Sequence, residues 1–270
     1  MRELVERAAN DAEGESRWLA PHARTALYRV ADPKTRTESL ASVVSVLLAG
    51  LLVPAVLLSL VLGPLSAAGI TEDGTPAAFT GAQTALNFLA LGGVAVAYLL
   101  WRDDRSLVGL RRPTRRDLAV TVVGFVGFVA VMFALEFLVR WLGFEFAENT
   151  AIEAGQENPE IFLLFIPLQF LFVAPAEELL FRGVVQGLLR RAYGIVPGVL
   201  AAGLAFSLFH VPALVATTGL GPTLAVIFVT GSLLGALYEY SGTLLVPIVV
   251  HALWNALVFA LQYAQATGGL

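Results

Sequence analysis

Long apolar stretches separated by short polar segments recur along the chain from about residue 40 onward. Each stretch is long enough to cross a hydrocarbon layer of about 30 Å as a helix of about 20 residues. The short alternating segments of a membrane β-barrel are missing from the pattern. We predict seven spans, at roughly 40–63, 80–101, 117–142, 160–190, 195–216, 222–240 and 243–265.

The number of spans is not fixed by the pattern, because prolines can interrupt a helix. Pro175, Pro212 and Pro247 fall within the last four apolar stretches, where a span can be broken or re-entrant. Six or eight spans therefore also fit the pattern. The first stretch is too long for the apolar region of a signal peptide, and we expect it to remain as an anchor.

The composition agrees with a membrane protein. Of the 270 residues, 57% are hydrophobic and only 14% are charged, which argues against a soluble domain with a polar shell. The expected fold class is an all-α, polytopic transmembrane helical bundle in a lipid bilayer. The chain has no cysteine, so disulfides and thiolate metal sites are excluded.

Basic residues are segregated along the sequence, and this sets the predicted orientation. Seven lie in a polar arm of residues 1–37 and six lie between residues 102 and 116, whereas residues 143–159 carry four glutamates and no basic residue. Lys and Arg favour cytoplasmic loops. We therefore predict a multi-pass protein of the cell membrane with a cytoplasmic N-terminal arm and, for seven spans, an external C-terminus. Topology alone accounts for the basic loops, and nucleic-acid binding is not expected.

Ionisable residues inside the apolar stretches are few, and most of them follow residue 160. Such a group at the bilayer centre costs roughly 2.5 to 3.5 kcal/mol on insertion scales, so it needs a partner or a function. The candidates are Glu177, Glu178, Arg182, His210 and His251, with Asn255 as a buried amide.

Helical geometry separates the two adjacent glutamates. Glu178 and Arg182 are four residues apart and share a helix face, which predicts an ion pair that supports the structure. Glu177 points about 100° away and has no basic partner within its own helix. Because Arg182 pairs with Glu178, Glu177 is the unpaired carboxylate, and we expect it to act in the chemistry of the site.

The two histidines can reach Glu177 from other helices. Glu177 lies 17 residues before Gly194 and His210 lies 16 residues after it, so in an antiparallel hairpin both sit about 24 Å from the turn. His251 shares a face with Asn255, but it lies only eight residues after Thr243, or about 12 Å of helix. Helix tilt or a turn recessed into the bundle would be needed to bring His251 to the same depth.

A carboxylate, two imidazoles and an amide that converge in a protected cavity predict a hydrolytic site with two possible mechanisms. In one, Glu177, His210 and His251 hold a zinc ion that activates water. In the other, Glu177 with His210 takes a proton from water without a metal, and His251 and Asn255 stabilise the oxyanion. The sequence has no HExxH motif, and the residues alone do not decide between the two.

Three motifs occur in order within the apolar helices: EExxxR at 177–182, FxxxH at 206–210 and HxxxN at 251–255. In this combination the chain resembles the CPBP family of intramembrane proteases, which comprises the CAAX prenyl endopeptidases and the Abi-type, bacteriocin-processing proteins. The likeness covers about residues 160–265. It implies an all-helical membrane endopeptidase with a core at 160–270, preceded by N-terminal transmembrane helices at 38–159.

The resemblance also implies roles for single residues. It makes Glu177 the catalytic glutamate, His210 and His251 the motif histidines, and Asn255 the polar residue that helps to hold the oxyanion. The implied substrate is a membrane-anchored peptide or protein, with or without a lipid group. The family is commonly labelled metalloprotease, although a glutamate-activated water has been argued for its CAAX members. The alternatives from other classes are a membrane immunity or scaffold protein that keeps the fold, and a transporter with a proton relay.

Overall fold

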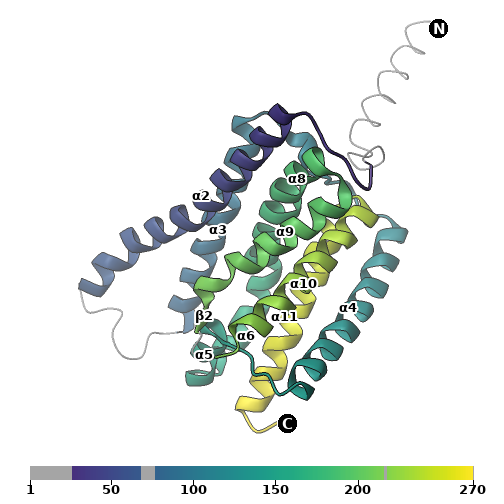
Figure 1. Cartoon of the computed structure of the whole chain (residues 1–270). Coiled ribbons are helices and arrows are strands. Elements are labelled where there is room, and N and C mark those ends of the chain that lie inside the picture. The colour runs from purple at the N-terminus through teal and green to yellow at the C-terminus, as the bar shows by residue number, and fades with distance from the viewer. Residues whose placement is uncertain (1–25, 68–76, 216–217, 270) are drawn as a thin grey trace, which may run out of the picture.

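The computed structural model describes residues 26–67, 77–215 and 218–269, and it is a bundle of helices (Figure 1). Within these residues, seven helical segments are long and apolar enough to cross a membrane. This confirms the predicted all-α class and the count of seven. Most of the predicted polar arm, residues 1–25 with His22, lies outside the described residues.

The spans are, in chain order, α2 (Pro33–Ala67), α3 (Ala77–Trp101), α4 (Arg115–Trp141), a compound helix from Glu160 to Tyr193, α9 (Ile195–Phe209), α10 (Leu220–Ser241) and α11 (Leu245–Ala266). Between them lie the 3₁₀ turns η1 (Arg105–Leu107) and η4 (Val211–Ala213), the short helix α5 (Thr150–Glu157), and the strands β1 (Glu148–Asn149) and β2 (Leu214–Val215). The two strands pair antiparallel, with Asn149 opposite Leu214.

The fourth span is continuous rather than broken. It consists of α6 (Glu160–Leu168), the π-helix η2 (Gln169–Val173), α7 (Ala174–Glu178), the π-helix η3 (Leu179–Val185) and α8 (Gln186–Tyr193). Proline lacks a backbone N–H and disturbs the regular ladder of hydrogen bonds, and Pro167 and Pro175 flank the first π stretch. Pi-helical stretches inside α-helices are frequent at functional sites. The residues around Glu177 therefore lie in a helix whose register shifts twice.

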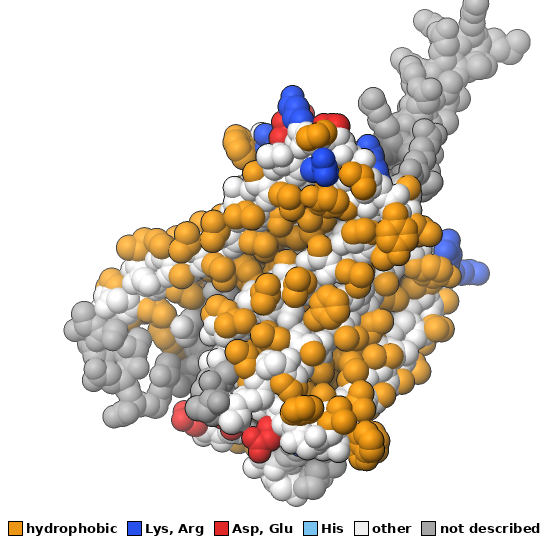
Figure 2. Space-filling model, viewed as in Figure 1, with side chains coloured by type: hydrophobic (Ala, Val, Ile, Leu, Met, Phe, Trp, Pro, Cys, Tyr) orange, Lys and Arg blue, Asp and Glu red, His pale blue; other side chains and the backbone are white. Residues whose placement is uncertain are grey.

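This fourth span lies at the centre of the bundle. Half of the residues in its most apolar 18-residue segment are buried inside the protein. For α4, which lies at the periphery, the corresponding share is 11%. The largest core cluster joins its buried residues to α2, α3 and α9. Apolar side chains cover much of the face shown in Figure 2, as expected where hydrocarbon rather than water surrounds a helix bundle.

Two turns close the same end of the bundle, and both are buried. At Gly194 the backbone has φ of +90°, and a Cβ atom would lie 2.8 Å from the carbonyl oxygen of Ala26, so this position needs glycine. The turn from α10 to α11 is covered by other segments. Thr243 is fully buried, Leu244 donates its N–H to the carbonyl of Gly109 at 2.8 Å, and Gly109 donates its own N–H to the Tyr238 hydroxyl at 2.7 Å.

The start of α4 is fixed to that covered turn. Asp117 is buried and accepts hydrogen bonds from both terminal nitrogens of Arg111, at 2.6 and 2.7 Å, and from Thr114, which caps the helix. The hydrogen bond to Asp117 raises the pKa of the Arg111 guanidinium. Arg111 also donates to the carbonyl of Ser241 at 3.0 Å. One carboxylate thus connects the loop before α4 to the end of α10.

Replacing Asp117 by asparagine is expected to lower the free energy of unfolding by about 1 to 3 kcal/mol, because the guanidinium loses a charged partner in a buried position. Thermal unfolding in detergent measures the change. The matched control is Glu136→Gln, which removes the ion pair with Arg140 at 3.1 Å on the exposed surface of α4. Such surface pairs contribute less than about 1 kcal/mol. Equal losses from both substitutions would contradict the structural role of Asp117.

Candidate active site

The two adjacent glutamates lie at the end of α7 and point into different surroundings. Glu178 is fully buried, and its Oε1 lies 3.0 Å from Nη1 of Arg182, which is also buried. The contact is an ion pair rather than a directed hydrogen bond, since Nη1 has no hydrogen-bond partner. Arg182 also donates from Nη2 to the carbonyl of Gly231 at 3.0 Å. The structure thus brings Glu178 and Arg182 together and connects them to α10.

Phe206 joins this ion pair to the histidines. The Arg182 guanidinium lies 4.5 Å from the centre of the Phe206 ring, a cation–π contact. The same ring lies 4.5 Å from the His210 ring and 6.0 Å from the His251 ring, centre to centre. Phe206 is the first residue of the FxxxH motif. Its ring packs against both imidazole rings.

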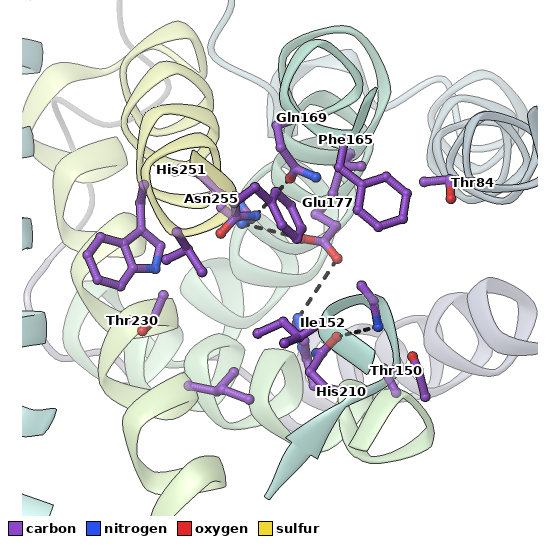
Figure 3. Close-up of a pocket in the computed structure, with 18 of the residues that line it drawn as sticks. Thr84, Thr150, Ile152, Phe165, Gln169, Glu177, His210, Thr230, His251 and Asn255 are labelled. Atoms are coloured by element: carbon purple, nitrogen blue, oxygen red, sulfur yellow. Dashed lines mark hydrogen bonds and ion pairs between the residues drawn. The ribbon is translucent and has the colours of Figure 1, made fainter. Parts of the chain in front are cut away.

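Glu177 faces the two imidazoles. Its Oε1 lies 3.9 Å from Nε2 of His210, and its Oε2 lies 3.6 Å from Nε2 of His251 (Figure 3). Both separations are longer than a direct hydrogen bond but short enough for one water molecule to bond to both partners. Three helices distant in the sequence, α7, α9 and α11, therefore contribute one functional group each to the same point.

The positions of these groups relative to the two turns can be compared with the structure. Glu177 and His210 flank Gly194 at nearly equal distances along the chain, and the structure brings them together as the hairpin predicts. His251 lies nearer to its own turn in sequence, yet its Nε2 lies 3.6 Å from Oε2 of Glu177. Thr243 in that turn is fully buried, as a turn recessed into the bundle would be.

The outer nitrogens of both rings are held in place, which fixes where their protons lie. His210 Nδ1 lies 2.7 Å from the carbonyl oxygen of Phe206. A carbonyl only accepts, so Nδ1 carries the proton and Nε2 of the neutral ring is an acceptor facing Glu177. His251 Nδ1 lies 2.9 Å from Glu178 Oε1, and the ionised carboxylate again makes Nδ1 the donor.

A cavity of about 480 Å³ opens in front of these groups. Glu177, His210, His251 and Asn255 all line it, which brings the four predicted catalytic residues to one space. The remaining wall is largely apolar, and it includes side chains from α3, α4, α5, α10 and α11. A largely apolar cavity with a few converging polar groups is the usual form of a site for a small molecule or peptide.

Asn255 bonds to a residue for which the sequence suggested no role, Gln169. Its Nδ2 donates to Oε1 of Gln169 at 2.8 Å (Figure 3). Gln169 is buried and begins the first π-helical stretch. An amide nitrogen has two N–H groups, so Asn255 keeps one donor besides the one given to Gln169. The only signal in the sequence was a polar side chain in an apolar helix, without a motif to give it a partner.

Replacing Gln169 by leucine is expected to slow peptide cleavage about tenfold and to lower the free energy of unfolding by about 1 kcal/mol, because the half-buried Asn255 amide loses its acceptor. The turnover rate and the melting temperature in detergent measure the two effects. Gln169→Glu is the control, because it keeps an acceptor oxygen and should restore most of the rate. An unchanged rate in Gln169→Leu would remove Gln169 from the site.

Glu177, His210 and His251 have the donor atoms of a catalytic zinc site, but these side chains are not arranged as zinc ligands in the structure. One carboxylate and two imidazole nitrogens are a known set of catalytic zinc ligands. Among the described residues, however, no group of three or more His, Cys, Asp or Glu side chains is arranged to hold a metal ion. We therefore assign no catalytic step to a metal.

The N-terminal helices contribute more to the site than the sequence indicated. The motifs all follow residue 160, and the first three spans offered no residue to assign. In the structure Thr84, Asn87 and Phe88 of α3 and Met132 of α4 line the cavity, as does the start of α5 with Thr150 (Figure 3). No short motif marks these positions, because they depend on how α3 and α5 pack against the fourth span.

Comparisons with known proteins agree with the motifs. Residues 159–257 match the family model described as type II CAAX prenyl endopeptidase Rce1-like. The match includes all three motifs and begins at the start of the fourth span. Searches of the curated proteins and of the solved structures found no significant match. Residues 159–257 therefore form an Rce1-like domain, which supports an intramembrane endopeptidase of the CAAX-protease type.

Proposed function

We propose that this protein hydrolyses a peptide bond of a membrane-anchored substrate, with Glu177 as the general base that activates water. The observation that carries the proposal is the position of the Glu177 carboxylate between Nε2 of His210 and Nε2 of His251, at 3.9 and 3.6 Å. Glu177 is buried in an apolar helix and lines the cavity. An intramembrane carboxylate that forms no ion pair with Lys or Arg is expected to serve a function.

Glu177 and His210 each present an acceptor atom to a water molecule between them. A water molecule that bonds to both Oε1 of Glu177 and Nε2 of His210 gives its protons to two acceptors. The carboxylate takes one proton as the oxygen adds to the carbonyl carbon of the scissile bond. His210 orients the water, and the carbonyl of Phe206 holds His210 in the required tautomer.

The negative charge that develops on the carbonyl oxygen needs donors on the opposite side. Asn255 offers its second N–H, and His251 offers Nε2–H when both ring nitrogens carry protons. Glu178 holds the ring of His251 through its other nitrogen, Nδ1. Glu178 therefore acts as a positioning residue through its 2.9 Å contact with His251 Nδ1.

The tetrahedral intermediate then collapses with the proton returned to the leaving group. Protonated Glu177 gives its proton to the amide nitrogen, the carbon–nitrogen bond breaks, and the products are a new carboxyl terminus and a new amine. The same carboxylate thus serves as base and acid in turn. In this scheme one water molecule is consumed, and side chains of the protein supply the base, the acid and the oxyanion donors.

The wild-type protein, reconstituted in proteoliposomes with a panel of lipidated and unlipidated peptides, is expected to cleave at the same rate with and without a zinc chelator. This follows because the proposed mechanism uses no metal. Mass spectrometry of the products gives the rate and the bond. A rate that falls with the chelator and returns with added zinc would contradict the metal-free mechanism, and it would favour the zinc arrangement of Glu177, His210 and His251.

A further inference from the structure

Positive charge gathers at one end of the bundle, which we call the basic end. It comprises residues 26–38, the loop and helix start at 102–116, and the turn at Gly194 with Arg190 and Arg191 before it. Three basic residues lie in 26–38 and six lie in 102–116. Among the described residues, Arg140 and Arg182 are the basic residues that lie elsewhere. In Figure 2 the blue side chains are visible at the top and upper right.

The opposite end, which we call the acidic end, comprises residues 142–160, 210–215 and 218–219. It carries five glutamates and no Lys or Arg in these segments, and the side chains visible at the bottom of Figure 2 include red but no blue. Loops rich in Lys and Arg stay in the cytoplasm, and the rule applies to short loops such as these. The basic end therefore faces the cytoplasm, and the acidic end faces the other side of the membrane.

The cavity lies toward the acidic end. Its wall includes Asn149 to Ile152, which lie in the segment after α4, and Ala213 in the segment after α9. His210 is the residue at which α9 ends on this side. None of the lining residues comes from the segments of the basic end.

The way from the cavity to the basic end is filled with side chains. Glu177 lies 17 residues before Gly194, or about 25 Å of helix. Every residue of the fourth span from Leu180 to Arg190 is buried, and Phe181, Val184 and Val185 have no exposed surface at all. Substrate that lies on the cytoplasmic side does not reach Glu177 along this path.

We propose that the cavity opens to the non-cytoplasmic side of the membrane, and that its substrates are membrane-anchored proteins cut in a segment exposed on that side, close to the bilayer. The substrate class rests on the proposed function. It differs from a prenylated C-terminus in the cytoplasm, which would approach the basic end.

The orientation can be tested with two cysteine variants, because the chain has no cysteine of its own. Gln156 in α5 and Ser106 in η1 are both exposed and polar, and they lie at the acidic and the basic end. In intact cells, a membrane-impermeant maleimide should label Gln156→Cys but label Ser106→Cys only after the membrane is permeabilised. The reverse pattern would overturn the inferred orientation.

The substrate class can be tested in the same cells by mass spectrometry of protein N-termini, with Glu177→Gln as the inactive comparison. New termini that need Glu177 should map to non-cytoplasmic segments next to membrane spans. Termini in cytoplasmic segments would overturn the substrate class and leave the proposed function intact. The absence of any Glu177-dependent terminus would overturn the proposed function and the substrate class with it, while the labelling pattern still decides the orientation.

Discussion

Replacing Arg182 by methionine is expected to lower the free energy of unfolding by roughly 3 to 5 kcal/mol, because it leaves a buried carboxylate without its counter-charge. Arg182 is almost completely buried and lies 3.0 Å from Glu178, which is fully buried. The substitution also removes the hydrogen bond to Gly231 and the contact with Phe206. Thermal unfolding in detergent and the yield of folded protein measure the loss.

A double variant separates the charge from the packing. Glu178→Gln with Arg182→Met removes both charges, and most of the lost stability should return, since replacing a whole buried ion pair is often nearly neutral. Cleavage by this double variant should be slower than by the wild type, because His251 loses the carboxylate that holds its Nδ1 at 2.9 Å. If Arg182→Met were as stable as the wild type, the ion pair would have no structural role.

Replacing Glu177 by glutamine is expected to reduce the rate of peptide cleavage by roughly 10²- to 10⁴-fold, the usual contribution of a general base. Glutamine has the same shape but does not take a proton from water. It also removes a buried negative charge that forms no ion pair with Lys or Arg among the described residues, so the protein should unfold at a similar or higher temperature. The loss of rate and the retained fold together separate a catalytic role from a structural one.

The fold was largely predictable because the bilayer makes the sequence simple to interpret. Apolar stretches of about 20 residues must be helices where no water satisfies the backbone, and the seven predicted spans match the structure to within a few residues at most ends. The largest differences are at the start of the first span, where α2 begins at Pro33 rather than near residue 40, and at the end of the fifth, where α9 ends at Phe209 rather than near residue 216. Polar side chains such as Thr35 and Thr37 shortened the predicted stretch, although Asp32 accepts from the N–H of Thr35 at the helix start.

Part of the candidate site was also predictable, because helical periodicity fixes which side chains share a face. The spacing of Glu178 and Arg182 and the hairpin around Gly194 both led to contacts that the structure contains. The contact of His251 with Glu178 was not foreseen. It joins residues 73 positions apart and depends on how α11 packs against the fourth span. The turn before α11 is bonded to Gly109, which in turn bonds to Tyr238, and no sequence period connects these residues.

The wall of the cavity was beyond the reach of the sequence. Gln169, Thr84 and Asn87 are isolated polar residues in apolar helices, and many such residues only bond to a neighbouring backbone. The shift of register in the π-helical stretches also decides which side of the fourth span meets the cavity. Such shifts depend on packing around Pro167 and Pro175, and they leave no regular pattern in the sequence.

The most direct test of the central claim is the cleavage of the peptide panel in proteoliposomes by three proteins in parallel: the wild type, Glu177→Gln and Glu136→Gln. Glu136→Gln makes the same chemical change at an exposed ion pair on α4 and controls for the substitution itself. We predict cleavage by the wild type and by Glu136→Gln, and a loss of at least about 10²-fold in Glu177→Gln. Equal cleavage by all three proteins would contradict the role of Glu177 as the base.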